Sequence, residues 1–201
     1  MERKWLVGGV AAILAIAAVL ALVVGGVVGR SIVPSPAETP PPAAQEPAPP
    51  ETIRFTDTLT DVSIAYPGTW KRRLPGDQRV RIVAASPDAS AAVSVSVRPS
   101  NLETVTSETL PIVRPLTDDL LRADDRITAV PEPVAVMIDG LPGYRYTYTY
   151  RREEGGLGAH VHYFLFKGDR LIQIVLQAVP ASKLPALQPT FDAIAGSFEI
   201  R

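Results

Sequence analysis

The chain has 201 residues, 46% of them hydrophobic, with 20 Lys plus Arg against 21 Asp plus Glu and no cysteine. This length suffices for one ordinary domain with a segment to spare. The lack of cysteine excludes disulfides, thiolate metal sites and a cysteine-linked lipid anchor. The nearly balanced charge provides no basic field for phosphates, so no nucleic-acid binding is expected.

The first predicted element is a transmembrane helix over residues 5–29. From Trp5 to Gly29 there are 25 residues without a charged or polar side chain. As a helix, at about 1.5 Å per residue, this segment crosses a hydrocarbon core of about 30 Å. A cleaved signal peptide is the alternative, but its apolar part usually has only about 7–15 residues. The sequence 35–37, Ser-Pro-Ala, is also a poor cleavage site because a proline stands between the two small residues.

Basic residues near the ends of this segment predict its orientation. Arg3 and Lys4 precede it, whereas only Arg30 follows it closely. Because loops rich in Lys and Arg stay in the cytoplasm, residues 1–4 are predicted to be a cytoplasmic tail. The chain is then a single-pass protein of the cell membrane, with its C-terminal domain outside the cytoplasm.

Residues 30–51 are predicted to be a proline-rich linker. Eight of the twenty residues from 31 to 50 are proline, and almost none is apolar enough to enter a core. This composition favours an extended spacer of about 3.1 Å per residue. Two functions stay open: the linker holds the domain away from the bilayer, or it only separates two folding units.

Residues 52–201 carry 17 basic and 17 acidic side chains and are predicted to form one α+β domain. Apolar residues at helical spacing predict helices over 113–121 and 184–194, with Pro185 and Pro189 as possible interruptions of the second. Alternating apolar and polar residues predict strands near 62–66, 80–82, 93–97, 134–138, 144–151, 159–167 and 170–178. The expected fold is an antiparallel sheet of about seven strands flanked by helices.

Three turn sequences carry a resemblance to a known family. They are Tyr66-Pro67-Gly68-Thr69-Trp70, the Gly-Leu-Pro-Gly-Tyr sequence from Gly140 to Tyr144, and Gly196-Ser197-Phe198. With one helix in the middle and one near the end, this order resembles the PsbP-like domain superfamily. That superfamily includes extrinsic photosynthetic PsbP proteins, a Ran-binding nuclear import factor and actinobacterial envelope proteins of the LpqN kind. Over residues 52–201 the resemblance implies an antiparallel sheet between helices and a role in docking, but no particular binding residue.

The sequence contains none of the common catalytic motifs. It has no Gly-x-Ser-x-Gly elbow, no His-Glu-x-x-His and no phosphate-binding loop. Paired acids such as Asp118-Asp119 and Asp124-Asp125 are adjacent and cannot face each other across a cleft. We therefore predict that the protein is not an enzyme and has no cofactor.

The only histidines, His160 and His162, alternate along one predicted strand, so their rings share a face. The two-residue turn after that strand, Gly168-Asp169, predicts Tyr163 opposite Ile174. The turn before it, near 153–157, leaves the register of the preceding strand open. Only one choice keeps the faces consistent: it buries the tyrosines at 144, 146, 148 and 150 on the face of Tyr163, with Tyr148 near Tyr163.

In that register the opposite face collects the candidate binding residues Arg145, Thr149, Arg151, His160, His162, Gln173 and Gln177. Because Arg, Thr and Gln are poor zinc partners, no metal site is predicted. The face suits a polar or anionic ligand, a partner surface or an ordinary solvated sheet. A second candidate is contact with an anionic surface by Trp70, Lys71, Arg72 and Arg73, against the alternative of solvated charge.

The predicted function is that of a membrane-tethered extracytoplasmic interaction or accessory module of the cell envelope. Its soluble domain is expected to be monomeric and to bind a protein partner. The alternative is a small-ligand or lipid-binding domain that uses the polar and aromatic face of the sheet. A large apolar pocket beside that face would favour this alternative.

Overall fold

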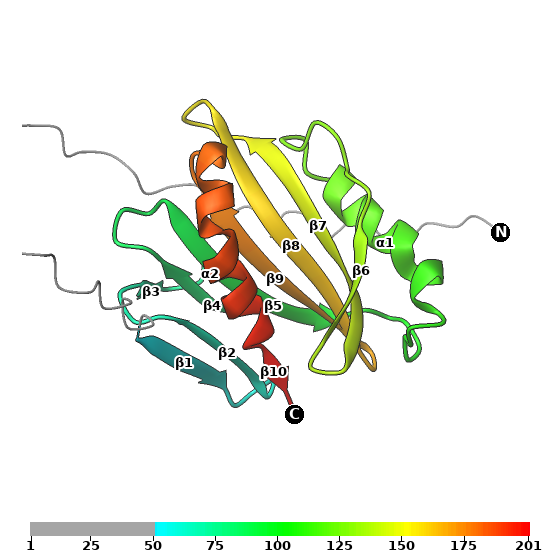
Figure 1. The fold of residues 1–201 in the computed structure, drawn as a ribbon. Coiled ribbons are helices and arrows are strands. Elements are labelled where there is room, and N and C mark those ends of the chain that lie inside the picture. The colour runs from blue at the N-terminus through cyan, green and yellow to red at the C-terminus, as the bar shows by residue number, and fades with distance from the viewer. Residues whose placement is uncertain (1–50) are drawn as a thin grey trace, which may run out of the picture.

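The computed structural model describes residues 51–201 (Figure 1). The predicted cytoplasmic tail and transmembrane helix, and the linker up to residue 50, lie outside the described residues. Within 51–201, no helix is both long enough and apolar enough to span a bilayer.

The described residues form ten strands, two α-helices and one short 3₁₀ helix. The helices are α1 (Leu110–Arg122), η2 (Ala181–Lys183) and α2 (Leu184–Gly196). The strands are β1 (Thr52–Asp57), β2 (Val62–Pro67), β3 (Lys71–Arg73), β4 (Val80–Ala85), β5 (Ala91–Pro99), β6 (Val134–Ile138), β7 (Leu141–Arg151), β8 (Leu157–Lys167), β9 (Arg170–Ala178) and β10 (Glu199–Ile200).

The strands form two antiparallel sheets, one of seven strands in the order β3-β4-β5-β9-β8-β7-β6 and one of three in the order β1-β2-β10. The predicted α+β class with a seven-stranded antiparallel sheet and two helices is confirmed. Strands β1, β3 and β10 are additional to the predicted ones, and the predicted strand near 62–66, β2, belongs to the small sheet and not to the large one. Helix α2 begins with Pro185 in its first turn and continues through Pro189, since a proline inside a helix removes one backbone hydrogen bond without necessarily ending it.

Helix α2 and the small sheet cover one side of the large sheet, which we call the α2 face (Figure 1). Alternate residues of β5, β8 and β9 point to this side and pack against Phe191 and Ile194 of α2. Ser197, at the end of α2, is hydrogen-bonded to β2: its Oγ accepts a hydrogen bond from the Ala65 backbone nitrogen at 2.8 Å. Full burial of each large apolar side chain here contributes about 1.5–3 kcal/mol.

Helix α1 covers part of the other side, which we call the α1 face. A second apolar cluster lies between the helix and strands β7 to β9, and α1 contributes Leu110, Leu121 and several partly buried apolar residues to it. The sheet contributes aromatic residues and one leucine: Tyr144, Tyr146, Tyr148, Phe164, Phe166 and Leu171. The large sheet therefore has a helix on each side, and α1 lies toward its β6 and β7 end (Figure 1).

The predicted register is right for one hairpin and wrong for the other. Strands β8 and β9 place Tyr163 opposite Ile174, as predicted. In β7, however, Tyr148 lies opposite His160 and not near Tyr163. The turn occupies residues 152–156, with both of its glycines at positive φ, and it shifts the pairing by three residues. An odd shift sends every side chain of β7 to the opposite face.

Candidate functional site on the α1 face

The corrected register divides the predicted binding residues between the two faces. The α2 face receives Arg145, Thr149 and Arg151. The α1 face receives His160, His162, Gln173 and Gln177. The four tyrosines of β7 are buried, as predicted, but they share a face with the histidines and not with Tyr163.

Two cross-strand rows on the α1 face run from β7 to the outer strand β3. One row contains Tyr148, His160, Gln177, Ala92, Ala85 and Lys71. The next contains Tyr146, His162, Val175, Ser94, Val83 and Arg73. Each row thus begins with a tyrosine of β7, passes through a histidine and uncharged residues, and ends with a cation.

The histidines belong to a continuous hydrogen-bonded chain. The Tyr148 hydroxyl lies 3.1 Å from His162 Nδ1 and 3.3 Å from His160 Nδ1. At one end, His160 Nε2 lies 3.2 Å from Gln177 Oε1. At the other, with the Gln173 amide nitrogen turned toward His162 Nε2 at 3.1 Å, its oxygen accepts from Arg98 Nε at 3.0 Å and from Nη2 at 3.1 Å.

A single arrangement of protons satisfies this chain from end to end. The Gln173 amide donates to His162 Nε2, so Nδ1 of that ring carries the proton and donates to Tyr148. The Tyr148 hydroxyl then donates to His160 Nδ1, and His160 Nε2–H donates to the Gln177 oxygen. Both imidazoles are neutral in this arrangement, and neither ring has a free nitrogen.

Burial keeps the histidines neutral over a wide pH range. His162 is 0% exposed and His160 is 7% exposed. Loss of hydration lowers the pKa of His160 to about 4 and that of His162 to about 3. The rings also stack on their neighbours, with centroids 4.1 Å apart for His162 and Phe164. At neutral pH neither histidine is available as an acid, a base or a metal ligand.

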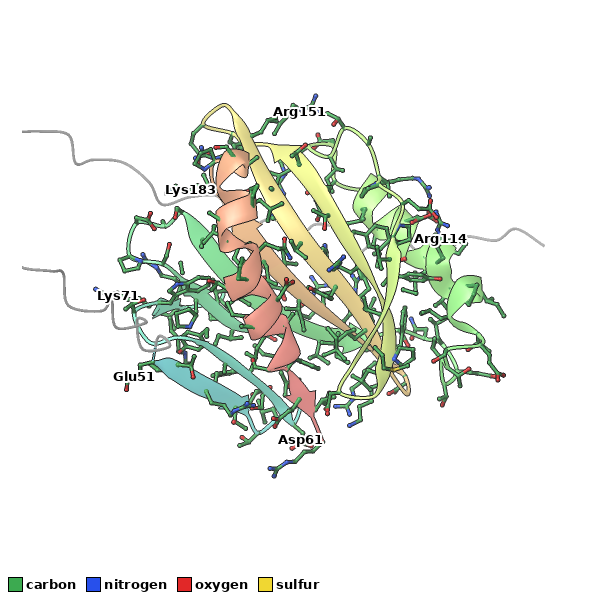
Figure 2. All side chains as sticks on the ribbon, in the orientation of Figure 1. Glu51, Asp61, Lys71, Arg114, Arg151 and Lys183 are labelled. Atoms are coloured by element: carbon green, nitrogen blue, oxygen red, sulfur yellow. The ribbon has the colours of Figure 1, made fainter. Side chains whose placement is uncertain are left out.

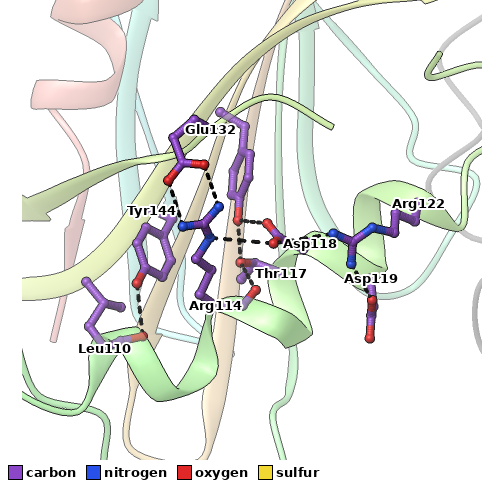
Figure 3. A network of polar contacts seen from close by, with 9 residues as sticks. Leu110, Arg114, Thr117, Asp118, Asp119, Arg122, Glu132 and Tyr144 are labelled. Carbon is purple, nitrogen blue, oxygen red and sulfur yellow. Dashed lines mark hydrogen bonds and ion pairs between the residues drawn. The ribbon is translucent and has the colours of Figure 1, made fainter. Parts of the chain in front are cut away.

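Polar contacts hold α1 on the tyrosines (Figure 3). The Tyr146 hydroxyl donates to Asp118 Oδ1 at 2.7 Å, and Tyr144 donates to the Leu110 carbonyl at 3.1 Å. Burial raises the pKa of Tyr146 well above its usual value. Asp119, the other member of the acid pair, contacts Arg122 at 2.7 Å. Asp118 therefore holds the helix on the sheet, whereas Asp119 pairs within α1 itself, and the aromatic part of the α1 face is covered by the helix.

Beyond α1 the same face is formed by β4, β5 and β9, and no helix of residues 51–201 packs on it. We call this surface the open half-face, and its side chains are mostly small or polar: Ala85, Ala92, Ser94, Ser96, Val175 and Gln177. Ser96, Val175 and Gln177 are partly exposed.

Arg98 lies at the border of the open half-face and was not indicated by the sequence. Its guanidinium is half-buried, and its polar contact is the Gln173 amide, since no carboxylate of the described residues pairs with it. Arg79 lies nearby but is matched by Asp77 at 2.8 Å. Burial, and then the charge of Arg79, lower the pKa of Arg98. A partly desolvated cation without a carboxylate is an incomplete arrangement.

The basic cluster of β3 is only partly as predicted. Trp70 is 8% exposed and belongs to the core of the α2 face, so the prediction that it contacts a surface is wrong. Lys71, Arg72 and Arg73 are exposed. The indole anchors the strand, and the three cations remain at the surface.

A groove of about 510 Å³ lies on the α2 face, between the start of α2 and β7. It is lined by the described residues Thr128, Ala129, Pro131, Thr147, Tyr148, Thr149, Ala159, Ala181, Ser182, Leu184 and Pro185. None of these is charged, and the histidines lie on the other side of the sheet. Of the predicted binding residues, the groove includes only Thr149.

No protein-family model matches the chain, and no curated protein matches it by sequence. Solved structures do match. Cyanobacterial PsbP (CyanoP) of Synechocystis sp. PCC 6803 is 16% identical over 79% of this chain and 98% of its own, with a TM-score of 0.58. The Ran-binding protein Mog1p of Saccharomyces cerevisiae is 11% identical over 76% of this chain and 96% of its own, with a TM-score of 0.51.

A more distant match is LpqN of Mycobacterium tuberculosis, described as involved in cell envelope biogenesis. It is 11% identical over 75% of this chain and 90% of its own, and its TM-score of 0.44 is too low to support a conclusion. Identities in this range show a common fold alone. The resemblance expected from the turn sequences is thereby confirmed at the level of the fold: residues 51–201 have a PsbP-like fold.

Proposed function

We propose that this domain is a non-catalytic protein-interaction module, held outside the cytoplasm by the predicted helix over residues 5–29. An acidic segment of a partner protein docks on the open half-face and pairs with Arg98. The tether and the accessory role come from the sequence prediction, and the open half-face is the surface of the fold to which we assign that role.

Arg98 is the observation that carries this proposal. Every arginine that packs near α1, namely Arg114, Arg122 and Arg126, has a carboxylate partner within the domain. Arg98 is partly desolvated and has only the Gln173 amide. A carboxylate from outside would complete its charge and its hydrogen bonds, and charge-assisted pairs of this kind are among the stronger polar contacts.

The state of the histidines supports an absence of catalysis. They are the only imidazoles in the sequence, and both rings are buried, neutral and fully hydrogen-bonded. A general base needs a free nitrogen near a reacting atom. That the structurally similar Mog1p is a Ran-binding protein supports the use of this fold for protein contact.

Site-specific photocrosslinking in cells tests the docking surface. A photoreactive residue placed at Ser96, on the open half-face, is expected to give a crosslinked adduct of defined size. The same residue at Ile112, which is exposed on α1, is the matched control and is expected to give none. Arg98→Glu should abolish the Ser96 adduct, and an adduct that survives this change would contradict the proposal.

The tether is tested separately. A reporter fused after Arg201 should be active only outside the cytoplasm, and the full chain should stay in the membrane pellet after a carbonate wash. Recovery of a shortened soluble form that begins near Glu38 would show cleavage in place of an anchor.

A second function, binding of a small uncharged molecule, is favoured by the groove of about 510 Å³ beside α2. The aromatic part of the α1 face offers no such space, because α1 fills it. An apolar fluorescent probe should bind the full chain, and Thr149→Trp should block its binding while leaving the Ser96 adduct intact. Probe binding unaffected by this change would exclude the groove.

A further inference from the structure

The outer strand β3 carries cations on both sides of the sheet. Lys71 and Arg73 pair with Ala85 and Val83 and point to the α1 face. Arg72 points to the other side, where its guanidinium lies 4.8 Å from the centre of the Phe55 ring. We call these three residues the basic edge.

The basic edge is not neutralised within the domain. None of its three side chains forms an ion pair with a carboxylate of residues 51–201, whereas the neighbouring Arg79 and Arg81 do. The next residue, Leu74, is 96% exposed. The buried Trp70, whose backbone nitrogen donates to the Pro67 carbonyl at 2.9 Å, fixes the start of the strand. The edge thus presents three exposed cations, followed by one exposed leucine.

The basic edge lies where the N-terminal segment joins the domain. Gly68, in the turn before β3, donates its backbone N–H to the Glu51 carbonyl at 2.7 Å. Glu51 and Lys71 lie near each other at the same end of the domain (Figure 2). The 50 preceding residues, with the predicted membrane helix, therefore connect to the domain beside this edge.

We propose that the basic edge and Leu74 dock on the anionic lipid headgroups of the bilayer that holds the N-terminal helix. This inference rests on the tether in the proposed function. A flat anionic surface can reach cations on both sides of an edge, which a groove on one face cannot do. Each Lys or Arg close to such a surface strengthens binding about fivefold, so three together contribute roughly 100-fold.

Charged residues on an outer strand also prevent sheet-to-sheet pairing. That role alone requires neither the exposed leucine nor a position at the junction with the tether. The two explanations differ in the surroundings of residue 74. If the charges only protect the edge, residue 74 stays in water, whereas docking on the bilayer places it among lipids.

The absence of cysteine permits a site-specific probe in the full chain. Leu74→Cys, labelled with an environment-sensitive fluorophore, is reconstituted in vesicles that contain nitroxide-labelled lipid. We expect strong quenching in vesicles of phosphatidylcholine with phosphatidylglycerol, little in phosphatidylcholine alone, and relief by high salt. Leu59→Cys, 83% exposed in the turn between β1 and β2, is the matched control and should show little quenching in either.

Charge removal completes the experiment. Lys71→Gln, Arg72→Gln and Arg73→Gln together should lower the equilibrium constant for contact roughly 100-fold. Substitution of Arg151, Arg152 and Arg201 by Gln removes the same charge elsewhere on the domain. It should change the equilibrium constant for contact little. Quenching that is equal in the two vesicle types, or that survives the first triple variant, would overturn the inference.

Three other outcomes also overturn it, and they differ in meaning. If residue 74 is shielded in both vesicle types and Glu38→Gln with Glu46→Gln exposes it, the occupant is the chain's own acidic linker. If the full chain is washed from the vesicles by carbonate, the tether fails, and the proposed function fails with it. A chain that is retained but not quenched removes the lipid contact alone.

Discussion

The two faces of the seven-stranded sheet bury side chains of the same strands by different means. On the α2 face, Val161, Leu165 and Ile174 meet the apolar residues of α2 and the small sheet. On the α1 face, the alternate positions of β8 include His160 and His162 as well as two phenylalanines, and hydrogen bonds satisfy each polar atom of the two imidazoles. The α2 face is stabilised by buried apolar area and by packing. The α1 face depends in addition on a series of hydrogen bonds in which every polar atom has a partner.

This difference determines how each face responds to change. Apolar contacts are non-directional, so loss of one side chain costs free energy in proportion to the cavity that remains. In the polar chain each proton position depends on the next, so removal of one hydroxyl leaves two imidazoles unsatisfied. The α2 face should respond mainly to volume, and the α1 face to pH and to single polar atoms.

The largest effect is expected from a cavity on the α2 face. Phe191 is 0% exposed, and Phe191→Ala should lower the free energy of unfolding by about 3–5 kcal/mol. Urea denaturation measures this loss, which should be the same at pH 7 and pH 5.5. A loss below 1 kcal/mol would mean that α2 does not form the core of this face.

The second effect is a loss of stability in mild acid. Because His160 and His162 have pKa values of about 4 and about 3 in the folded protein, against about 6.5 when unfolded, these protons bind mainly to the unfolded chain between about pH 6 and pH 5. Each histidine then destabilises the fold by about 1.4 kcal/mol per pH unit as the pH falls. At pH 5.5 the two together should cost about 3 kcal/mol relative to pH 7.5.

Replacement of both histidines by glutamine is the control for this pH dependence. The sequence predicts them to be surface residues whose joint replacement changes stability by less than about 1 kcal/mol. Their burial makes that prediction wrong: the variant should be less stable at pH 7 and nearly insensitive to pH between 7 and 5. If the stability of the wild-type protein is equally insensitive to pH, the two histidines are not buried in neutral form.

The third effect isolates one oxygen atom. Tyr148→Phe removes the hydroxyl between the two imidazoles, and the two groups left unsatisfied should together cost about 2–3 kcal/mol. Tyr150→Phe, two residues along the same strand, is the matched control, because its hydroxyl makes no hydrogen bond within the described residues. It should cost less than about 0.5 kcal/mol. Equal losses in urea denaturation would show that the tyrosines contribute by packing alone.

Much of the α2 face could be predicted from the sequence. Alternation in β8 and β9, with the two-residue turn Gly168-Asp169, sets Tyr163 opposite Ile174, and the structure confirms it. The same reasoning fails for β7, because the turn at 152–156 has five residues and several registers close it equally well. The tyrosines can be apolar or polar, so hydrophobicity alone could not decide which face they join.

The site residues were harder to predict because they depend on contacts between distant strands. Arg98 meets Gln173 only because β5 pairs with β9, and no local pattern in the sequence reports that pairing. The histidines were identified as a pair on one face, which is right. Their rings are covered by aromatic neighbours such as Tyr148 and Tyr150, which share their face only in the observed register of β7.

The smallest effect concerns the surface contacts that accompany α1. Glu132 is 77% exposed at its side chain and receives two hydrogen bonds from Arg114, each 2.6 Å long (Figure 3). Because water solvates both ions well, Glu132→Gln should lower the free energy of unfolding by less than about 1 kcal/mol. Arg114→Gln should cost more, since Arg114 also lies 3.5 Å from Asp118, which holds Tyr146. If urea denaturation shows Glu132→Gln to cost as much as Tyr148→Phe, surface charge and not the buried polar chain stabilises the α1 face.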